Sequence, residues 1–268
     1  MFYVTMKAGA VMSSIILETM LVIFIYFLCF FIVGTLIKNN SIVDIGWGLG
    51  FVIVAWFTTL RTANFYLPNI IVTVLITIWG LRLFYHIIKR NLGKKEDFRY
   101  ANWRKEWGKL VIPRAFLQVY MLQGVFMFIV ALPIILLNNE PFSKLTLIGV
   151  VGIIIWIIGF YFESVGDYQL KIFKANPENK GKIMDQGLWS YTRHPNYFGE
   201  ATMWWGLGII SFFSGSSILV FLSPITITYL LLFVSGVPML EKSFANRPGY
   251  KEYAEKTPVF FPWFPKKD

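Results

Sequence analysis

The sequence predicts an all-α integral membrane protein with seven transmembrane helices, its N-terminus outside and its C-terminus in the cytosol. The 268 residues are 56% hydrophobic and only 15% charged. Seven apolar runs approach the roughly 20 residues that a helix needs to cross a bilayer. Twenty of the 25 lysines and arginines fall in three segments, 89–114, 171–194 and 242–268. Basic residues gathered in this way mark cytosolic segments, which fixes the orientation.

We expect the membrane spans at residues 15–37, 42–60, 66–90, 115–137, 145–168, 195–213 and 217–240. Cytosolic loops then cover 90–114 and 171–194, and a cytosolic tail covers 241–268. The outer segments carry few basic residues, namely Lys7, Arg61 and Lys144. Because the sequence shows neither an internal repeat nor a linker, we expect residues 1–268 to form a single domain.

The second and third spans carry ionisable side chains near their cytosolic ends. Asp44 opens the second span, where Gly46, Gly48 and Gly50 favour close packing against neighbouring helices. In the third span Arg82, His86 and Arg90 recur every four residues and so share one helix face. This face indicates either basic side chains that reach the headgroups or a partner for Arg82, such as Asp44 or a bound anion.

The fifth span is expected to continue into the cytosol as a helix with one polar face, made by Glu163, Asp167, Lys171 and Lys174. Carboxylates on such a face can accept hydrogen bonds from ribose or carboxamide groups, and the lysines can bind phosphate. The alternative is a set of helix-surface ion pairs, such as Asp167 with Lys171.

The segment Leu188–Glu200 reads Leu-Trp-Ser-Tyr-Thr-Arg-His-Pro-Asn-Tyr-Phe-Gly-Glu and leads into the sixth span. It places Arg193 and His194 at the mouth of a membrane helix, where Pro195 suits the first turn. Asn196 and Glu200 are four residues apart, so they share a face and can hold one ligand. The alternative is a capped helix whose Arg and His lie among lipid headgroups.

After the last span, residues 240–262 combine Tyr250 and Tyr253 with basic residues and end in a proline-rich apolar stretch. This segment indicates either a helix on the membrane surface or a lid over a cytosolic pocket. Most of the ionisable groups in or near the spans map to the cytosolic half, which favours one cavity open to the cytosol over a transport path.

The net charge of +10 comes mainly from the three basic segments expected in the cytosol. This placement favours anionic lipid headgroups or a phosphorylated cofactor as the partner and excludes nucleic acid. His86 and His194 are the only histidines and Cys29 is the single cysteine, which excludes a metal site built from these residue types.

Three parts of the chain resemble the steroid 5-alpha-reductase superfamily, and in particular its bacterial branch: Gly187–Glu200, the Glu163 and Asp167 face, and Arg247–Pro262. The resemblance covers about residues 40–265. It implies an NADPH-dependent reductase of the bacterial cytoplasmic membrane with its site facing the cytosol. Its substrate would be an apolar, lipid-like α,β-unsaturated carbonyl compound that enters from the bilayer.

The resemblance also implies which residues bind the cofactor. They are Glu163, Asp167, Lys174, Lys182, Asn196, Glu200 and Tyr253, to which the motif adds Arg193 and His194. The steroid enzymes polarise the substrate carbonyl with a Gln-Glu pair and a tyrosine. Here Asp44 is the nearest acid, Trp79 takes the place of the tyrosine, and Tyr85 and His86 are nearby proton donors. The catalytic candidates are therefore Asp44, Tyr85 and His86.

Membrane methyltransferases of the isoprenylcysteine carboxyl or phospholipid type also carry an Arg-His-Pro-x-Tyr run, a following acid and a tail that ends in proline. Arg193–Tyr197, Glu241 and Tyr250–Pro262 fit that pattern as well. Their cofactor, S-adenosylmethionine, has no phosphate. Three features favour the reductase: Asn196 with Glu200, the face with Glu163 and Asp167, and the seven spans. A lipid-binding or assembly protein without enzyme activity is the third hypothesis.

Overall fold

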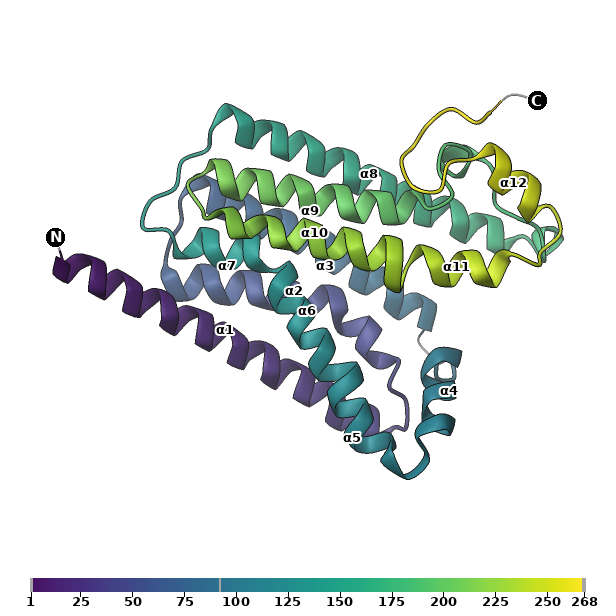
Figure 1. Ribbon diagram of the computed structural model, residues 1–268, viewed down its shortest axis with the longest axis horizontal. Helices are drawn as coiled ribbons and strands as arrows, with labels where there is room; N and C mark the ends of the chain where they lie inside the picture. The colour runs from purple at the N-terminus through teal and green to yellow at the C-terminus, as the bar shows by residue number, and fades with distance from the viewer. Residues whose placement is uncertain (1, 92, 267–268) are drawn as a thin grey trace. The chain divides into compact units, whose positions relative to one another are not determined.

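The computed structural model describes residues 2–91 and 93–266, with side chains from residue 14 onward, and every regular element in this part of the chain is helical (Figure 1). Contacts divide the chain into two compact units. Unit 1 comprises Met1–Leu145 and Ser211–Val220, and unit 2 comprises Thr146–Ile210 and Phe221–Asp268. Each unit is described by itself below, and the expectation of a single domain stays a prediction.

Unit 1 contains α1 (Phe2–Leu36), α2 (Ile42–Thr62), α3 (Leu67–Asn91), α4 (Phe98–Trp107), α5 (Val111–Ala115), α6 (Leu122–Val130) and α7 (Leu132–Asn139). A π-helical segment, Phe116–Met121, joins α5 to α6. Pro133 lies in the first turn of α7, where the missing N–H costs no hydrogen bond. The Asp97 side chain accepts a hydrogen bond of 3.0 Å from the Arg99 backbone N–H and so caps α4.

The glycines of α2 pack against three different helices of unit 1. Gly46 lies against Phe30 of α1, Gly48 against the backbone of Gly80 in α3, and Gly50 against Met127 of α6. The packing role predicted for these glycines is confirmed.

A buried polar network ties α2, α3 and α7 together. The Asn138 amide donates to the hydroxyls of Thr58 and Thr59, each at 2.9 Å, and accepts from Asn69 at 2.9 Å. Thr59 and Thr73 share a further hydrogen bond of 2.7 Å. Since every one of these groups is withdrawn from solvent, the mutual hydrogen bonds avoid the cost of an unsatisfied polar group.

Unit 2 contains α8 (Leu147–Ala175), α9 (Pro195–Phe213), α10 (Leu222–Tyr229), α11 (Val237–Phe244) and α12 (Tyr250–Lys256). The last residues of α9, from Ser211, belong to unit 1. Figure 1 shows α8 and α9 side by side and antiparallel. Their glycines face each other: Gly152 lies against Gly206 and Gly159 against Gly199, and Gly166 lies against Pro195. Without side chains at these positions the two backbones come into direct contact.

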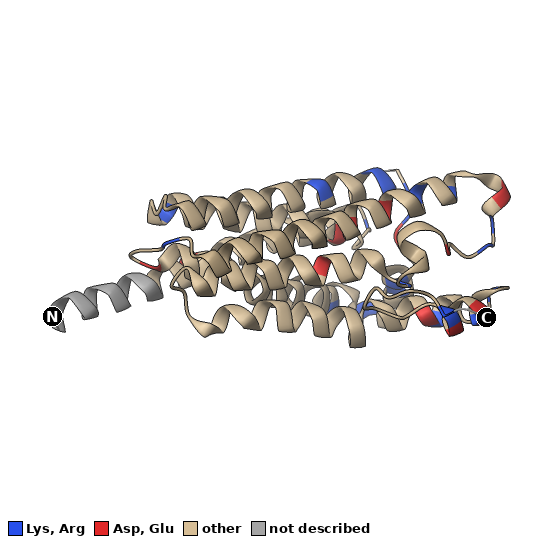
Figure 2. Ribbon diagram, turned by 90° about the horizontal axis from the view of Figure 1, so that it is seen from above, with Lys and Arg blue, Asp and Glu red and all other residues tan. Residues whose placement is uncertain are grey.

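Among the residues that the structure describes, six helical segments are long and apolar enough to cross a membrane: Ser14–Leu36, Ile42–Thr62, Leu67–Asn91, Phe98–Val130, Leu147–Ala175 and Ile218–Phe244. The expected span 195–213 forms α9 with the predicted limits but is not among these six. Figure 2 shows the long helices free of charged residues over most of their length. Six apolar helices indicate an integral membrane protein, while the seventh span and the orientation stay predictions.

The structure differs from the expected loop 90–114 because part of that segment is the helix α4. Tyr100 and Trp107 of α4 are buried, so this helix packs against the rest of the unit. The expected fourth span, 115–137, is likewise made of four pieces: the end of α5, the π-helical segment, α6 and the greater part of α7.

We expect Gly199→Ala to lower the free energy of unfolding by about 1–3 kcal/mol, because the added methyl group would collide with the backbone of Glu163 and Gly159. The matched control is Gly208→Ala on the same helix, where the new Cβ would meet its nearest atom at an ordinary 3.4 Å. The melting temperature in detergent should fall for the first variant alone. An equal loss in both variants would contradict the close packing.

Candidate functional site

The segment Leu188–Glu200 is attached to α8 by side-chain hydrogen bonds. The Trp189 indole N–H donates to the Gly166 carbonyl at 3.0 Å, and the Leu188 backbone N–H donates to the Gln169 side chain at 3.0 Å. Gly187 has a φ of +60°, a conformation that favours glycine, and its Cα lies against Gln169. These contacts fix the direction in which the chain enters α9.

The C-terminal tail is bonded to the other side of the same segment. The Arg193 backbone N–H donates to the Pro258 carbonyl at 2.9 Å, and the Thr192 hydroxyl donates to the Phe260 carbonyl at 2.8 Å. From α12, the Tyr253 hydroxyl donates to the Trp189 carbonyl at 2.6 Å. The segment that carries Arg193 and His194 is therefore held between α8 and the tail.

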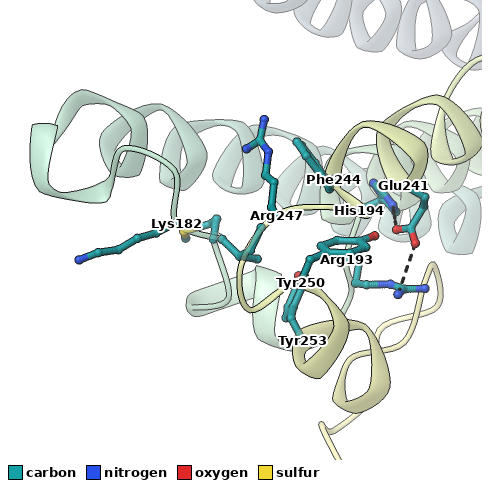
Figure 3. Close-up of a pocket in the computed structure, with 10 residues that line it drawn as sticks. Lys182, Arg193, His194, Glu241, Phe244, Arg247, Tyr250 and Tyr253 are labelled. Atoms are coloured by element: carbon teal, nitrogen blue, oxygen red, sulfur yellow. Dashed lines mark hydrogen bonds and ion pairs between the residues drawn. The ribbon is translucent and has the colours of Figure 1, made fainter.

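Arg193 and His194 meet one carboxylate, that of Glu241 in α11 (Figure 3). His194 Nε2 lies 2.8 Å from Glu241 Oε1, and Arg193 Nη1 lies 3.4 Å from Glu241 Oε2. The imidazole is 2% exposed and stacks on the Tyr197 ring at a centroid distance of 5.5 Å. This cluster of Arg193, His194 and Glu241 is called the acid–base cluster below.

Burial lowers the pKa of His194 below its ordinary value of 6.5 and outweighs the hydrogen bond to Glu241, which acts in the opposite direction. A neutral imidazole that donates from Nε2 to the carboxylate leaves Nδ1 as an acceptor. The buried Nδ1 of His194 and the buried Nε of Arg193 have no hydrogen-bond partner. Each of these two enclosed atoms therefore keeps an unused hydrogen-bonding position.

A cavity of about 40 Å³ opens at the acid–base cluster and is lined by Lys182, Ile183, Met184, Arg193, His194, Glu241, Phe244, Arg247, Tyr250 and Tyr253. It has room for about one water molecule. Burial raises the pKa of Tyr250, with the neighbouring Glu241 carboxylate adding to the effect, and burial also raises the pKa of Tyr253. Both hydroxyls therefore stay protonated at neutral pH.

A wider pocket of about 340 Å³ lies beside this cavity and is lined by Phe173, Lys174, Ala175, Asn176, Pro177, Asn179, Lys180, Gly181, Lys182 and Arg247. Four of these side chains are cationic and none is acidic. Lys182 and Arg247 line both spaces. Asn179 fixes the loop by donating to the Phe173 carbonyl at 3.0 Å. This space is called the basic pocket below, and its charge suits a phosphorylated or otherwise anionic ligand.

A family model described as "Protein of unknown function (DUF1295)" matches residues 30–257. The chain belongs to this family. The family is associated with steroid 5-alpha-reductase-like membrane proteins.

Over 60 residues the chain is 43% identical to a protein of Ustilaginoidea virens named "Probable O-methyltransferase ustE". The match covers 22% of this chain and 21% of that protein, so the similarity spans about a fifth of the relative. No solved structure matches the chain.

In this member of the DUF1295 family, the predicted cofactor residues of unit 2 separate into two groups. The first group lines the two spaces just described: Lys174, Lys182, Arg193, His194 and Tyr253. The second group consists of residues on α8 and α9: Glu163, Asp167, Asn196 and Glu200. There the Asn196 amide donates to Asp167 at 3.1 Å, and Glu163 is 3% exposed beside Gly199. The second group is not among the lining residues of either space.

The three catalytic candidates belong to unit 1. Both carboxylate oxygens of Asp44 have partners in or next to α4: Arg99 Nη2 lies 2.9 Å from Oδ2, and the Tyr100 hydroxyl donates to Oδ1 at 2.6 Å. Tyr85 is 58% exposed, with the Lys89 ammonium 4.6 Å from its ring centre, and His86 is half-buried. Trp79 is buried and contacts Phe51 within the helix packing.

Sequence reasoning missed several residues that line the site, including Lys180, Arg247 and Tyr250. It also left Glu241 outside the set of site residues. The sequence associates Glu241 with the methyltransferase pattern, and it offers the tail both as part of the reductase resemblance and as a possible lid over a cytosolic pocket. The sequence does contain a signal for Arg247 and Tyr250 as site residues, because they stand three positions apart in a tail that carries many basic and aromatic residues.

We expect His194 to titrate below pH 6.5, because burial disfavours the imidazolium. Because the pKa of His194 is lower in the folded state, the unfolded state binds more protons than the folded state between the folded pKa and 6.5. The unfolding free energy should therefore decrease as the pH falls below 6.5 towards the folded pKa. The slope is at most about 1.4 kcal/mol per pH unit. NMR of histidine-labelled protein measures the pKa, and His86→Gln assigns the single remaining signal. Glu241→Gln should lower the pKa further, whereas a His194 pKa above 6.5 would refute the buried neutral imidazole.

We expect Asp44→Ala to lower the unfolding free energy of unit 1 by about 1–3 kcal/mol, since it leaves the buried Tyr100 hydroxyl without its acceptor. The control is Glu106→Ala on α4, where the side chain is exposed. Surface substitutions of this kind change stability little. Thermal unfolding in detergent should therefore separate the two variants, and equal melting temperatures would show that α4 does not depend on Asp44.

Proposed function

We propose that the protein is a membrane-embedded, NADPH-dependent reductase of the carbon–carbon double bond in an apolar α,β-unsaturated carbonyl lipid. The basic pocket is the observation that carries this proposal. Four cationic side chains and no acidic one line a space of about 340 Å³. A ligand that suits them carries several negative charges, as the phosphates of NADPH do, and Lys182 and Arg247 connect this pocket to the acid–base cluster.

The residues of unit 2 have distinct roles in this proposal. Lys174, Lys180, Lys182 and Arg247 bind phosphate oxygens, with the Arg247 guanidinium held 4.3 Å above the Phe244 ring. The hydroxyls of Tyr250 and Tyr253 stay protonated and lie on the side of the cavity formed by the tail. The unpartnered Nε of Arg193 can donate and the unpartnered Nδ1 of His194 can accept a hydrogen bond from the ligand.

NADPH, when bound, supplies the hydride that reduces the β-carbon of the unsaturated carbonyl. The chain's own task is then to hold the cofactor and to provide an acid that protonates the product. Asp44, Tyr85 and His86 remain the predicted candidates for that acid. The same proposal places the protein in the bacterial cytoplasmic membrane with its site facing the cytosol. The substrate then enters the site from the bilayer.

A methyltransferase that uses S-adenosylmethionine is the second candidate. It is favoured by the local similarity to a fungal protein named as a probable O-methyltransferase. The pairing of Arg193 and His194 with Glu241 also fits the sequence pattern of such enzymes. The basic pocket argues for the reductase, because S-adenosylmethionine offers no phosphate to its four cations.

Titration of the purified protein with NADPH, NADH and S-adenosylmethionine tests the proposal. NADPH should bind and raise the melting temperature. The pair Lys182→Ala and Arg247→Ala should weaken NADPH binding about 100-fold, since each lost charge-assisted hydrogen bond corresponds to about tenfold. Lys251→Ala is the matched control, because Lys251 is exposed on α12 and lines neither space.

Two outcomes would contradict the reductase. The first is binding of S-adenosylmethionine without binding of NADPH. The second is NADPH binding that is equally strong in the double variant and in Lys251→Ala, which would place the cofactor elsewhere.

A further inference from the structure

The tail exposes three aromatic side chains within four residues. Phe261 is 73% exposed, and Trp263 and Phe264 are each 72% exposed. In water this arrangement is unfavourable, since each ring leaves a large apolar area uncovered. At the boundary between lipid headgroups and acyl chains, by contrast, tryptophan and other aromatic side chains are enriched.

The backbone holds these side chains outward. Phe260 is 4% exposed, and its carbonyl accepts from Thr192. The Trp263 N–H donates to the Tyr191 carbonyl at 2.9 Å, and the Lys266 N–H donates to the Lys256 carbonyl at 3.0 Å. The segment 259–264 is therefore fixed on the inside by hydrogen bonds and by Phe260, and it presents a defined aromatic face on the outside.

This aromatic face continues the apolar surface of a membrane helix. The Phe261 ring lies 6.2 Å from the Phe198 ring of α9, which lies 5.1 Å from the Phe162 ring of α8. The adjacent surface of α8 is apolar and exposed at Ile154, Ile157, Ile158 and Tyr161. Leu147–Ala175 is long and apolar enough to cross a bilayer, and the ring contacts connect its apolar surface to the tail.

The charges beside the aromatic face suit the same environment. Lys256 and Lys266 are brought together by the hydrogen bond between their backbones. Basic residues at the edge of an aromatic face can contact anionic lipid headgroups while the rings enter the boundary region.

We propose that residues 259–264 form a membrane-interface anchor, in which Phe261, Trp263 and Phe264 insert at the headgroup–acyl boundary of the bilayer. The anchor is independent of the reaction. Its consequence for the site rests on the proposed function. The anchored segment is bonded to Tyr191 and Thr192, and Pro258 directly before it is bonded to Arg193, so the bilayer steadies the segment that leads to the cofactor residues.

Spin-label accessibility in lipid nanodiscs that contain anionic lipid tests the anchor. Cys29 is the single cysteine, so Cys29→Ser provides a background for labelling at Trp263→Cys. A label at Lys251→Cys, on the exposed face of α12, is the control. The label at 263 should lie about 5–10 Å below the headgroup surface. Its exposure to a water-soluble nickel reagent should be at least about fivefold lower than at 251, and its exposure to oxygen should be higher.

Either of two results would overturn the anchor: equal nickel exposure at 263 and 251, or shielding from both reagents together with dipolar broadening between labels. The second result would mean that another copy of the chain covers the face. The triple variant Phe261→Ser, Trp263→Ser, Phe264→Ser reports on the site, because it should weaken NADPH binding several-fold in nanodiscs. If the label at 263 lies deep in the bilayer but the protein binds no NADPH, the result supports the anchor and contradicts the proposed reductase.

Discussion

The direct contact between the backbones of α8 and α9 is the constraint on which the rest of unit 2 depends. Gly152, Gly159 and Gly166 recur every seven residues along α8, and Gly199 and Gly206 do the same along α9. A seven-residue repeat keeps one face of each helix in contact over several turns. The contact places Asp167 within hydrogen-bond distance of Asn196 and sets Pro195 against Gly166, so the start of α9 cannot move away from α8. The preceding segment, with Arg193 and His194, is positioned as a result.

The balance of charges differs between two neighbouring spaces of unit 2. At the narrow cavity, burial keeps His194 neutral and Arg193 is paired with Glu241, so the charges within the acid–base cluster largely cancel. In the basic pocket four cations stand at an open surface without an acidic neighbour among the lining residues. Water can solvate the exposed lysines there until an anion binds, so the pocket keeps its positive potential at little cost in stability. This contrast supports a ligand with a charged end and an uncharged, hydrogen-bonding end.

Much of the architecture could be predicted because it follows from composition and periodicity. The limits of α9 agree with the expected 195–213, and Gly46, Gly48 and Gly50 pack as predicted. The partners of Asp44 could not be predicted, since Arg99 and Tyr100 come from a polar segment more than 50 residues away with no helical period of its own. The same holds for Glu241, which reaches His194 across 47 residues. The glycine repeat of α8 was present in the sequence, but its meaning depends on α9 carrying the matching repeat.

Lys182 and Arg247 line both the basic pocket and the narrow cavity, and this shared boundary links two equilibria. An anion bound in the basic pocket neutralises positive charge close to His194, which makes the imidazolium less unfavourable. By thermodynamic reciprocity, a proton on His194 then strengthens the binding of that anion by the same factor. The uptake of a phosphorylated ligand and the uptake of a proton are coupled through these two side chains, so the affinity for such a ligand should rise as the surroundings become more acidic.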